Sequence, residues 1–150
     1  GPDTEDLALA SVLHDLGKIA ISDQVLNKPG RLTSEEFEEV MEHTVIGHSI
    51  LEHSSRRVLK LAATIALDHH EKWDGSGYPR GKRGTEIAAE ARIVAVADVY
   101  DALRSERAYK RAWDRRETRE QLIADAGRHF DPLMIDHFTK VEPEIAVLYG

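Results

Sequence analysis

Apolar residues recur at helical spacing along most of the chain, and this periodicity restricts the fold more than any other feature. Residues 3–16, DTEDLALASVLHDL, carry one apolar stripe with acidic residues in the first turn, and Gly17 is placed to end the helix. Thr33 and Glu36 then form a capping-box pattern that opens a helix of about twenty residues. From this helix we expect seven residues to face the core: Phe37, Val40, Met41, Thr44, Gly47, Ile50 and Leu51.

The segment ARIVAVADVYDAL, residues 91–103, contains β-branched residues that are typical of a strand. Its apolar length, its alanine content and its lack of turn residues favour a buried helix instead, capped by Thr85. Asp114 and Glu117 resemble a second capping box, and Pro132 suits the first turn of a last helix. The expected helices therefore cover 3–16, a short turn near 22–26, the segment from 34, a segment from Ser54 or Ser55 to about 71, the segment after 85, 115 to about 126, and a last segment from 132.

The pattern contains no convincing strand pair and no internal repeat. We therefore predict an all-α fold, a helical bundle of about five to six main helices with no sheet. At 150 residues, a single compact domain over residues 3–150 is expected. Gly1 and Pro2 are typical of the remnant left by tag removal, and we leave them out of the domain.

Composition argues against several classes of protein. The chain has no cysteine, which rules out disulfides and thiolate metal sites and fits a reducing compartment. Its net charge of −7 argues against binding of duplex nucleic acid, which depends on neutralising phosphates with Lys and Arg. The chain has no export leader and no long apolar run, so we expect no membrane contact from this segment.

Histidines provide several candidate functional residues, but they cannot all serve one site. His43, His48 and His53 share one predicted helix at intervals of five residues. Each interval rotates the side chain by about 140°, so at most one or two of the three point to the same place. The two histidines of the C-terminal part, which lie outside any cluster of acids and histidines, are interpreted as structural or surface residues: His129 and His137.

Two adjacent pairs, His14-Asp15 and His69-His70, lie at the ends of predicted helices. Each pair alone is as typical of a surface helix end as of a metal site. Asp98 interrupts an otherwise apolar helix, where a carboxylate is costly unless it is paired or bound to a cation. Together these residues favour a site for divalent Fe, Mn, Ni, Co or Zn, which imidazole and carboxylate bind well. A carboxylate that bridges two such ions supports phosphoester hydrolysis.

Several segments, in this order, resemble the HD-GYP family, a branch of the HD-domain metal-dependent phosphohydrolases. An HD pair alone is a weak signal, but the order and the separations of these segments are highly specific together. The resemblance covers the chain from about Leu7 to Phe138 and implies an HD-domain-like helical fold. The segments are HDLGK (14–18), KPGRLTSEE (28–36), MEHTVIGHSIL (41–51), HHEKWDGSGYP (69–79), ARIVAVADVYDAL (91–103) and RHFDP (128–132).

The resemblance also implies a centre of at least two divalent metal ions and assigns roles to residues of this chain. Asp15 is the implied bridging ligand and Lys18 the implied contact to the scissile phosphate, so both are candidate catalytic residues. Tyr78 is a candidate for substrate binding, and we expect Glu71 to orient a ligand imidazole. The implied metal ligands are His14, Asp15, His43, His69, His70 and Asp98, and the implied GYP loop is Gly77, Tyr78 and Pro79.

The chain departs from the family pattern at two places. None of the thirteen residues before His14 is a histidine, whereas the family usually has a ligand histidine well upstream. Either the domain lacks its first helices, which is our expectation, or the site itself lacks these ligands, and in both cases a third metal ion is not expected. After Asp98, Arg104 replaces a small hydroxyl residue and Ala108 replaces a proline.

Residues 104–119 carry seven basic and three acidic residues, a local charge of +4 in a chain of −7. Such a strip suits an anionic substrate, although a solvated surface with internal ion pairs explains it equally well. By resemblance, Arg107, Tyr109 and Lys110 align with contacts to the phosphates of the ligand. We expect Arg107 and Lys110 to face the site and the later arginines to point elsewhere.

The resemblance implies a bacterial, cytoplasmic phosphodiesterase. It would hydrolyse cyclic di-GMP, or a related cyclic dinucleotide, to the linear dinucleotide or to GMP by attack of a metal-bound hydroxide. The alternative is a catalytically weak or inactive binding module that signals through a partner, such as a diguanylate cyclase domain at the GYP loop. A different HD-type nucleotide phosphohydrolase fits less well, because the GYP elements are additional to plain HD proteins. The apolar stripes also include a candidate homodimer face.

Overall fold

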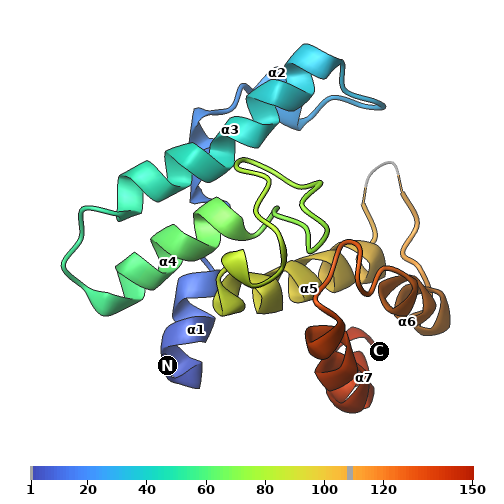
Figure 1. The fold of residues 1–150 in the computed structure, drawn as a ribbon. Coiled ribbons are helices and arrows are strands. Elements are labelled where there is room, and N and C mark those ends of the chain that lie inside the picture. Colours follow the sequence, from blue (N-terminus) through green and yellow to red (C-terminus); the bar gives the residue numbers. More distant parts are fainter. Residues whose placement is uncertain (1, 108–109) are drawn as a thin grey trace.

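The computed structural model describes residues 2–107 and 110–150, and these residues form a helical bundle (Figure 1). Within them the only strand-like pairings are isolated bridges between Arg107 and Lys110 and between Ala126 and Phe130, so the all-α prediction is confirmed. The elements are α1 (Thr4–Ser11), the 3₁₀ turn η1 (Leu16–Ala20), α2 (Asp23–Leu26), α3 (Ser34–Leu51), α4 (Arg57–Asp68), the 3₁₀ turn η2 (Gly84–Glu86), α5 (Ala89–Arg104), α6 (Arg115–Ala124), α7 (Pro132–Ala146) and the 3₁₀ turn η3 (Val147–Tyr149).

The helix starts that depend on local sequence are confirmed. The Thr33 hydroxyl accepts the backbone N–H of Glu36, and the Glu36 carboxylate accepts the backbone N–H of Thr33, so both halves of the capping box form. Asp114 and Glu117 make the same reciprocal pair at the start of α6. Pro132 is the first residue of α7, where its missing N–H costs no helical hydrogen bond.

The first helix is shorter than predicted, because it ends at Ser11 and not at residue 16. The chain turns through His14 and Asp15 and then enters η1. Gly17 does not cap the first helix but brings η1 against α3. A Cβ on Gly17 would lie 1.9 Å from the carbonyl oxygen of His43, so only glycine permits this approach.

The segment between α4 and α5 also differs from the prediction. α4 begins at Arg57 and ends at Asp68, before the two histidines, and Thr85 lies within η2 and does not cap α5. The buried Asp68 carboxylate pairs with the Lys82 ammonium at 2.7 Å and accepts the backbone N–H of Ala88 at 3.3 Å. These tertiary contacts fix the end of α4 and the start of α5.

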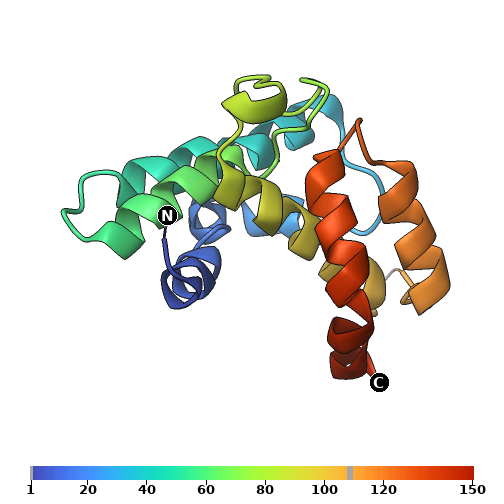
Figure 2. The same cartoon turned by 60° about the horizontal axis from the view of Figure 1, so that its bottom comes forward.

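Two apolar clusters form the core, and α5 contributes to both. Figure 2 shows α5 running between α1 on one side and α7 on the other. The face of α5 that joins α1, α3 and α4 carries Val94, and its C-terminal half packs with α6 and α7. The first cluster contains Ala10, Leu51, Ala62, Ala63, Ile65, Ala66 and Val94, and the second contains Val96, Tyr100, Leu103, Leu122, Phe130, Ile135 and Phe138.

Only part of the predicted inner face of α3 is buried. Thr44, Gly47 and Leu51 are buried, as expected. Phe37 and Ile50 were expected to face the core, but they remain 47% and 49% exposed. The reason is that η1 and α4 cover the middle of α3 and leave these side chains uncovered. None of the helices described is both long and apolar enough to cross a membrane.

Candidate metal centre

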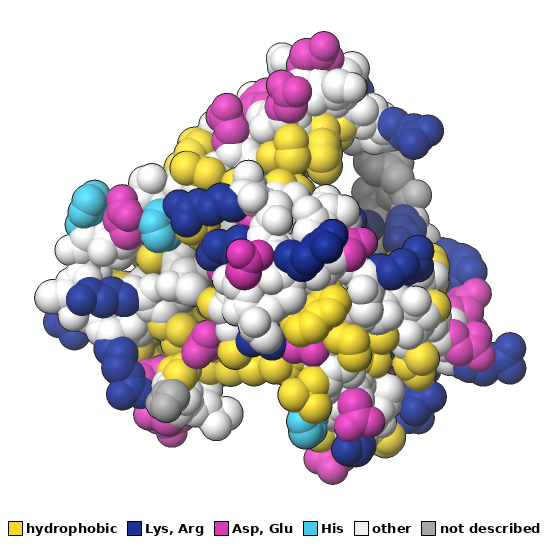
Figure 3. Space-filling model, in the orientation of Figure 1, with side chains coloured by type: hydrophobic (Ala, Val, Ile, Leu, Met, Phe, Trp, Pro, Cys, Tyr) yellow, Lys and Arg dark blue, Asp and Glu magenta, His cyan; other side chains and the backbone are white. Residues whose placement is uncertain are grey.

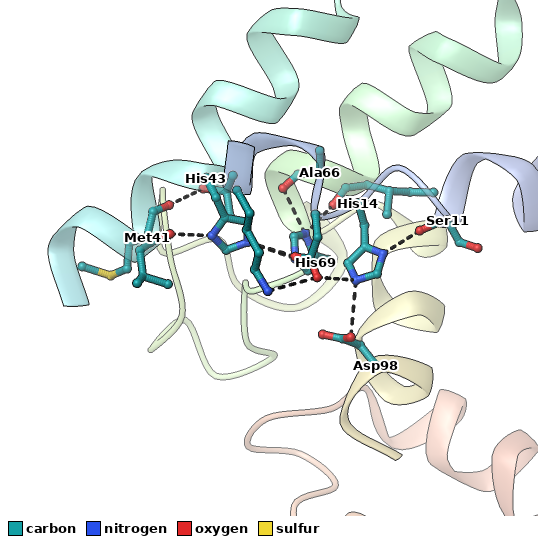
Figure 4. A network of polar contacts seen from close by, with 12 residues as sticks. Ser11, His14, Met41, His43, Ala66, His69 and Asp98 are labelled. Carbon is teal, nitrogen blue, oxygen red and sulfur yellow. Dashed lines mark hydrogen bonds and ion pairs between the residues drawn. The ribbon is translucent and has the colours of Figure 1, made fainter. Parts of the chain in front are cut away.

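Four separate segments bring histidines and aspartates to one place (Figure 4). The turn after α1 provides His14 and Asp15, α3 provides one histidine, the turn after α4 provides two, and α5 provides one aspartate. Within each of two groups, one ligand atom per residue lies within 4.8 Å of all the others. The first group is Asp15, His43, His69 and His70, and the second is His14, His69 and Asp98.

Asp15 lies at the centre of this arrangement and faces both groups. Its Oδ1 lies 3.3 Å from Nε2 of His43 and 3.5 Å from Nε2 of His69. Its Oδ2 lies 3.2 Å from Nε2 of His14, and that nitrogen is also 3.3 Å from Oδ1 of Asp98. The two oxygens of one carboxylate therefore point to different sets of imidazoles.

Three of the imidazoles turn Nδ1 away from the cluster and bond it to main-chain carbonyls. A carbonyl only accepts hydrogen bonds, so Nδ1 must carry the proton. Nε2 then faces the cluster, where its lone pair is free to bind a metal in the neutral ring. The accepting carbonyls are those of Ser11 for His14, Val40 for His43, and Ile65 and Ala66 for His69.

Buried polar atoms test whether this set of side chains fits a cation. Nε2 of His14 and Oδ1 of Asp15 are buried, and neither has a hydrogen-bond partner among the described residues. An unsatisfied buried nitrogen and an unsatisfied buried carboxylate oxygen are costly unless something binds them. Imidazole and carboxylate are the donors that divalent first-row ions prefer, so the residues present fit such ions.

The titration of the carboxylates shows how strongly they hold positive charge. Burial alone would raise the pKa of Asp15, but the imidazoles of His14, His43 and His69, whose Nε2 atoms lie 3.2–3.5 Å from its oxygens, hold the pKa far below its ordinary value. Burial alone would also raise the pKa of Asp98, but the contact with His14 and the charges of His14 and His69 in their protonated forms together lower it. In turn, the contacts with Asp15 and then Asp98 raise the pKa of His14 to about 10.

His70 differs from the other ligand candidates because it stays neutral. Burial, followed by repulsion from the rings of His69 and His43 whenever these are protonated, lowers its pKa to about 3. Its ring stacks on the ring of Tyr78, with centroids 4.9 Å apart and planes inclined by 15°. Burial and the nearby carboxylates raise the pKa of Tyr78 to about 12, so its hydroxyl remains a hydrogen-bond donor.

The GYP loop lies directly on the backbone of the second histidine pair. The backbone N–H of Tyr78 donates to the carbonyl oxygen of His70 at 3.2 Å. A Cβ on Gly77 would lie 2.4 Å from the backbone nitrogen of Lys72 and 2.5 Å from the carbonyl oxygen of His70. Glycine is therefore required at this position, since no side chain fits between Gly77 and the backbone of residues 70–72.

Glu71 has a different role from the one expected. Its buried carboxylate accepts the backbone N–H of Arg80 at 2.7 Å and that of Lys82 at 3.0 Å, and no imidazole donates to it in the described structure. The prediction that Glu71 orients a ligand imidazole is therefore wrong. Sequence reasoning missed its loop contacts because its partners are backbone groups nine and eleven residues later, which carry no signal in residue type.

Lys18 and the basic strip of residues 104–119 differ in their contacts with the cluster. Nζ of Lys18 lies 3.2 Å from Oδ2 of Asp15, and the side chain is 42% exposed, so its charge stands at the mouth of the cluster. The backbones of Arg107 and Lys110 pair with each other, and the Lys110 ammonium lies over the ring of Trp113. Neither side chain contacts the cluster in the described residues, so their expected role stays a prediction.

The later arginines of the strip form ion pairs elsewhere, as the alternative interpretation expected. Arg111 pairs with Glu117, Arg115 with Glu142 and Arg116 with Glu120. Ala108 and Tyr109, which the sequence comparison singled out, lie outside the described residues.

The other histidines lie away from the metal-ligand candidates. His48 shares α3 with His43, but its Nδ1 bonds to the carbonyl of Ala63 and its Nε2 pairs with Glu52. His53 lies beyond the end of α3 with an exposed side chain. His129 stacks on Phe130, and its carbonyl accepts the backbone N–H of Trp73, which ties the RHFDP segment to the loop after His70.

Comparison with known proteins places this fold and site in a family. The model of the HD domain matches residues 1–134, so the chain belongs to the HD domain family. It is 48% identical over 127 residues to 3′3′-cGAMP-specific phosphodiesterase 2 of Vibrio cholerae, covering 85% of this chain and 24% of that protein. It is 46% identical over 144 residues to the cyclic di-GMP phosphodiesterase of Thermotoga maritima, covering 96% of this chain and 39% of that protein.

A third relative is the cyclic di-GMP phosphodiesterase response regulator RpfG of Xanthomonas campestris, 47% identical over 144 residues, 96% of this chain and 38% of that protein. The chain thus spans between 24% and 39% of the length of these curated relatives. These matches confirm the resemblance to the HD-GYP type that the motifs predicted.

The fold is also found in a solved structure. The crystal structure of the cyclic GMP-AMP-specific phosphodiesterase V-cGAP3 of V. cholerae superposes with a TM-score of 0.65 at 19% sequence identity. The match covers 92% of this chain and 38% of that chain. At this level of identity the similarity concerns the fold, and it agrees with the predicted HD-domain-like helical bundle.

Proposed function

We propose that this domain is a metal-dependent phosphodiesterase that hydrolyses cyclic di-GMP or a related cyclic dinucleotide. The observation that carries the proposal is the convergence of six imidazole and carboxylate side chains from four segments, with their ligand atoms aimed at one another. The names of the relatives, which are cyclic di-GMP and 3′3′-cGAMP phosphodiesterases, support this substrate class.

We infer two metal positions that share Asp15. His43 and His69 adjoin its Oδ1 and His70 belongs to the same group, whereas His14 adjoins its Oδ2 and also contacts Asp98. This division suits a carboxylate that bridges two ions. A pair of divalent ions in such a site supplies activation of water and neutralisation of charge on the reacting phosphate. The native metal is proposed to be one of Fe, Mn, Ni, Co and Zn, since all accept imidazole and carboxylate.

The residues of the chain itself hold and orient the substrate. The Lys18 ammonium, partly exposed beside Asp15, offers a positive charge to a phosphate oxygen at the mouth of the cluster. Arg107 and Lys110 are proposed to contact the second phosphate from the exposed strip after α5. Since the chain has no cysteine, a thiolate nucleophile is ruled out, and our reaction scheme uses no covalent intermediate on the protein.

The remaining expectations about partners belong to this proposal. We propose the GYP loop, Gly77 to Pro79, as the surface for contact with a diguanylate cyclase domain, and an apolar helix face as a homodimer contact. A bacterial cytoplasmic location follows from the proposed substrate. The cyclase contact stands on the resemblance, the homodimer contact on the apolar stripes, and the location also on the lack of cysteine; each is separate from the chemistry of the cluster.

The test is metal content and hydrolysis measured on the same samples. The protein would be loaded with each candidate metal, and cleavage of cyclic di-GMP and 3′3′-cGAMP followed by chromatography, which also separates linear dinucleotide from GMP. We expect Asp15→Ala to lose metal and activity together. His53→Ala, an exposed histidine outside the cluster, is the matched control and should retain both.

Two results would contradict the proposal. Full metal loading without turnover of either dinucleotide would favour a binding module. Equal activity of wild type and Asp15→Ala would show that the cluster is not the catalytic site.

A further inference from the structure

Phe37 is a large aromatic side chain that lies beside the candidate metal centre without filling the core. It sits in the first turn of α3 and remains 47% exposed. Its ring meets the ring of Tyr78 edge to face, with centroids 6.0 Å apart and an interplanar angle of 84°. A half-exposed phenylalanine gains only part of its burial free energy, and this one lies against Tyr78, whose ring stacks on the ligand candidate His70, so Phe37 adjoins the site.

Phe37 ends a row of aromatic rings that leads from the buried cluster to the surface. The first ring, His43, is fully buried and lies 5.1 Å from the ring of His70. His70 stacks on Tyr78 at 4.9 Å, and Tyr78 adjoins Phe37. Exposure thus increases along the row, from ligand candidates that hold metal to a ring that meets solvent.

A cyclic dinucleotide whose phosphate lies at the metal centre carries its bases away from that centre. Stacking of a base on an aromatic ring stabilises a complex by about 1–3 kcal/mol and needs only a free ring face. One face of Tyr78 is already occupied by His70. Phe37 touches Tyr78 only through an edge-to-face contact and has open surface, so it has a face to offer.

The acidic residues around Phe37 favour the base of the ligand over its phosphates at this position. Phe37 is preceded by Glu35 and Glu36 and followed by Glu38 and Glu39. Figure 3 shows acidic side chains gathered at the end of the molecule formed by α2 and the start of α3, with hydrophobic side chains exposed next to them. Negative charge repels phosphates but tolerates a neutral base. The start of α3 therefore suits a base and not a phosphate.

We propose that Phe37 is a substrate-binding residue, a stacking platform for one purine base of the cyclic dinucleotide. This inference rests on the proposed function, since it takes the phosphodiester to lie at the cluster of His14, Asp15, His43, His69, His70 and Asp98. It assigns the recognition of the base to α3 and the chemistry to the cluster. Phe37 contributes to substrate affinity and does not touch the reacting atoms.

The test compares KM and kcat for cyclic di-GMP in the wild type, Phe37→Ala, Phe37→Trp and Val45→Ala. Val45 lies on the same helix and is also 47% exposed, so it is the matched control. Loss of one stacking contact should raise KM roughly 5- to 150-fold, with kcat within about twofold of wild type. Phe37→Trp should restore the KM of wild type, and Val45→Ala should not change it.

The outcomes separate this inference from the proposed function. If wild type turns over cyclic di-GMP and Phe37→Ala has the KM of wild type, the inference falls and the function stands. An equal rise in KM for Val45→Ala, or no recovery in Phe37→Trp, would show a general effect on α3 and also overturn it. If wild type neither cleaves cyclic di-GMP and 3′3′-cGAMP nor binds either in calorimetry, both proposals fall. If wild type binds without cleavage, the same comparison is made on Kd, and an unchanged Kd in Phe37→Ala overturns the inference.

Discussion

The carboxylate of Glu71 accepts the backbone N–H of Arg80 at 2.7 Å, and this bond closes the GYP loop over His70. The second oxygen of Glu71 accepts the N–H of Lys82, so one buried side chain satisfies two main-chain donors. Between these residues the loop carries Tyr78, whose ring lies on the ring of His70. Glu71 is therefore a positioning residue for the aromatic wall of the site.

Glu71→Gln should destabilise the domain and weaken substrate binding. The amide of glutamine has one acceptor oxygen, so one of the two backbone N–H groups would face an NH₂ donor. The unsatisfied buried donor costs about 1–3 kcal/mol of unfolding free energy. Urea denaturation and KM for cyclic di-GMP measure the two effects. The control is Glu86→Gln, because Glu86 makes a similar bond to the N–H of Arg83 in an exposed part of the same loop. Equal stability losses in both variants would contradict the role given to Glu71.

Gly17→Ala should disrupt the approach of η1 to α3. The added Cβ would lie 1.9 Å from the carbonyl oxygen of His43, a backbone atom that cannot move away without shifting α3. We expect the free energy of unfolding to fall by about 1–3 kcal/mol, the usual cost of overpacking. Metal binding should also weaken, because Asp15 moves relative to His43. Thermal denaturation and metal stoichiometry give the readouts. Ala20→Ser, at an exposed position of the same turn, should leave both unchanged. A Gly17→Ala protein with wild-type stability would refute this account.

Lys82→Met should be strongly destabilising, because it leaves the carboxylate of Asp68 buried and unpaired. The side chain of Asp68 is 1% exposed, and Lys82 Nζ lies 2.7 Å from its Oδ2. Removing one partner of a buried pair typically costs about 3–5 kcal/mol. The exposed pair of Lys140 and Asp136 supplies the comparison, and Lys140→Met should change stability by no more than about 0.5 kcal/mol. Chemical denaturation of both variants measures the two losses of unfolding free energy. Similar losses would show that the buried pair contributes no more to stability than the exposed pair.

The decrease in unfolding free energy at acid pH should depend on Glu142. Hydrogen bonds from Arg115 hold the pKa of this buried carboxyl below its ordinary value of 4.5 in the folded state, although burial acts in the opposite direction. A lowered folded-state pKa contributes stability that is fully present above pH 4.5 and is lost as the pH falls through the folded-state pKa. Glu142→Gln should therefore flatten the decline in unfolding free energy below pH 4.5. Glu120→Gln, at an exposed pair with Arg116, should keep the wild-type slope. An unchanged slope in Glu142→Gln would rule out this carboxyl as a source of acid sensitivity.

The sequence by itself determined the parts of this protein that depend on near neighbours. Thr33 with Glu36, and Asp114 with Glu117, start helices where predicted, because a capping box is a contact between residues three apart. Apolar periodicity gave the all-α class, and the order of the motifs gave the family and the candidate ligands. The rotation of a helix also indicated that His43, His48 and His53 could not all meet, and only His43 reaches the cluster.

Only the tertiary structure decided the features that depend on distant segments. The first helix ends at Ser11 because the following turn must bring Gly17 to the carbonyl of His43, a contact no local pattern encodes. Phe37 fits the apolar stripe of α3 yet stays exposed, because stripe position does not say which part of a helix another element will cover. Asp15 becomes the centre of the site because two other segments place the imidazoles of His43 and His69 at one of its oxygens, while the neighbouring His14 lies at the other. Distances of this kind arise from packing, and packing is set by the whole chain at once.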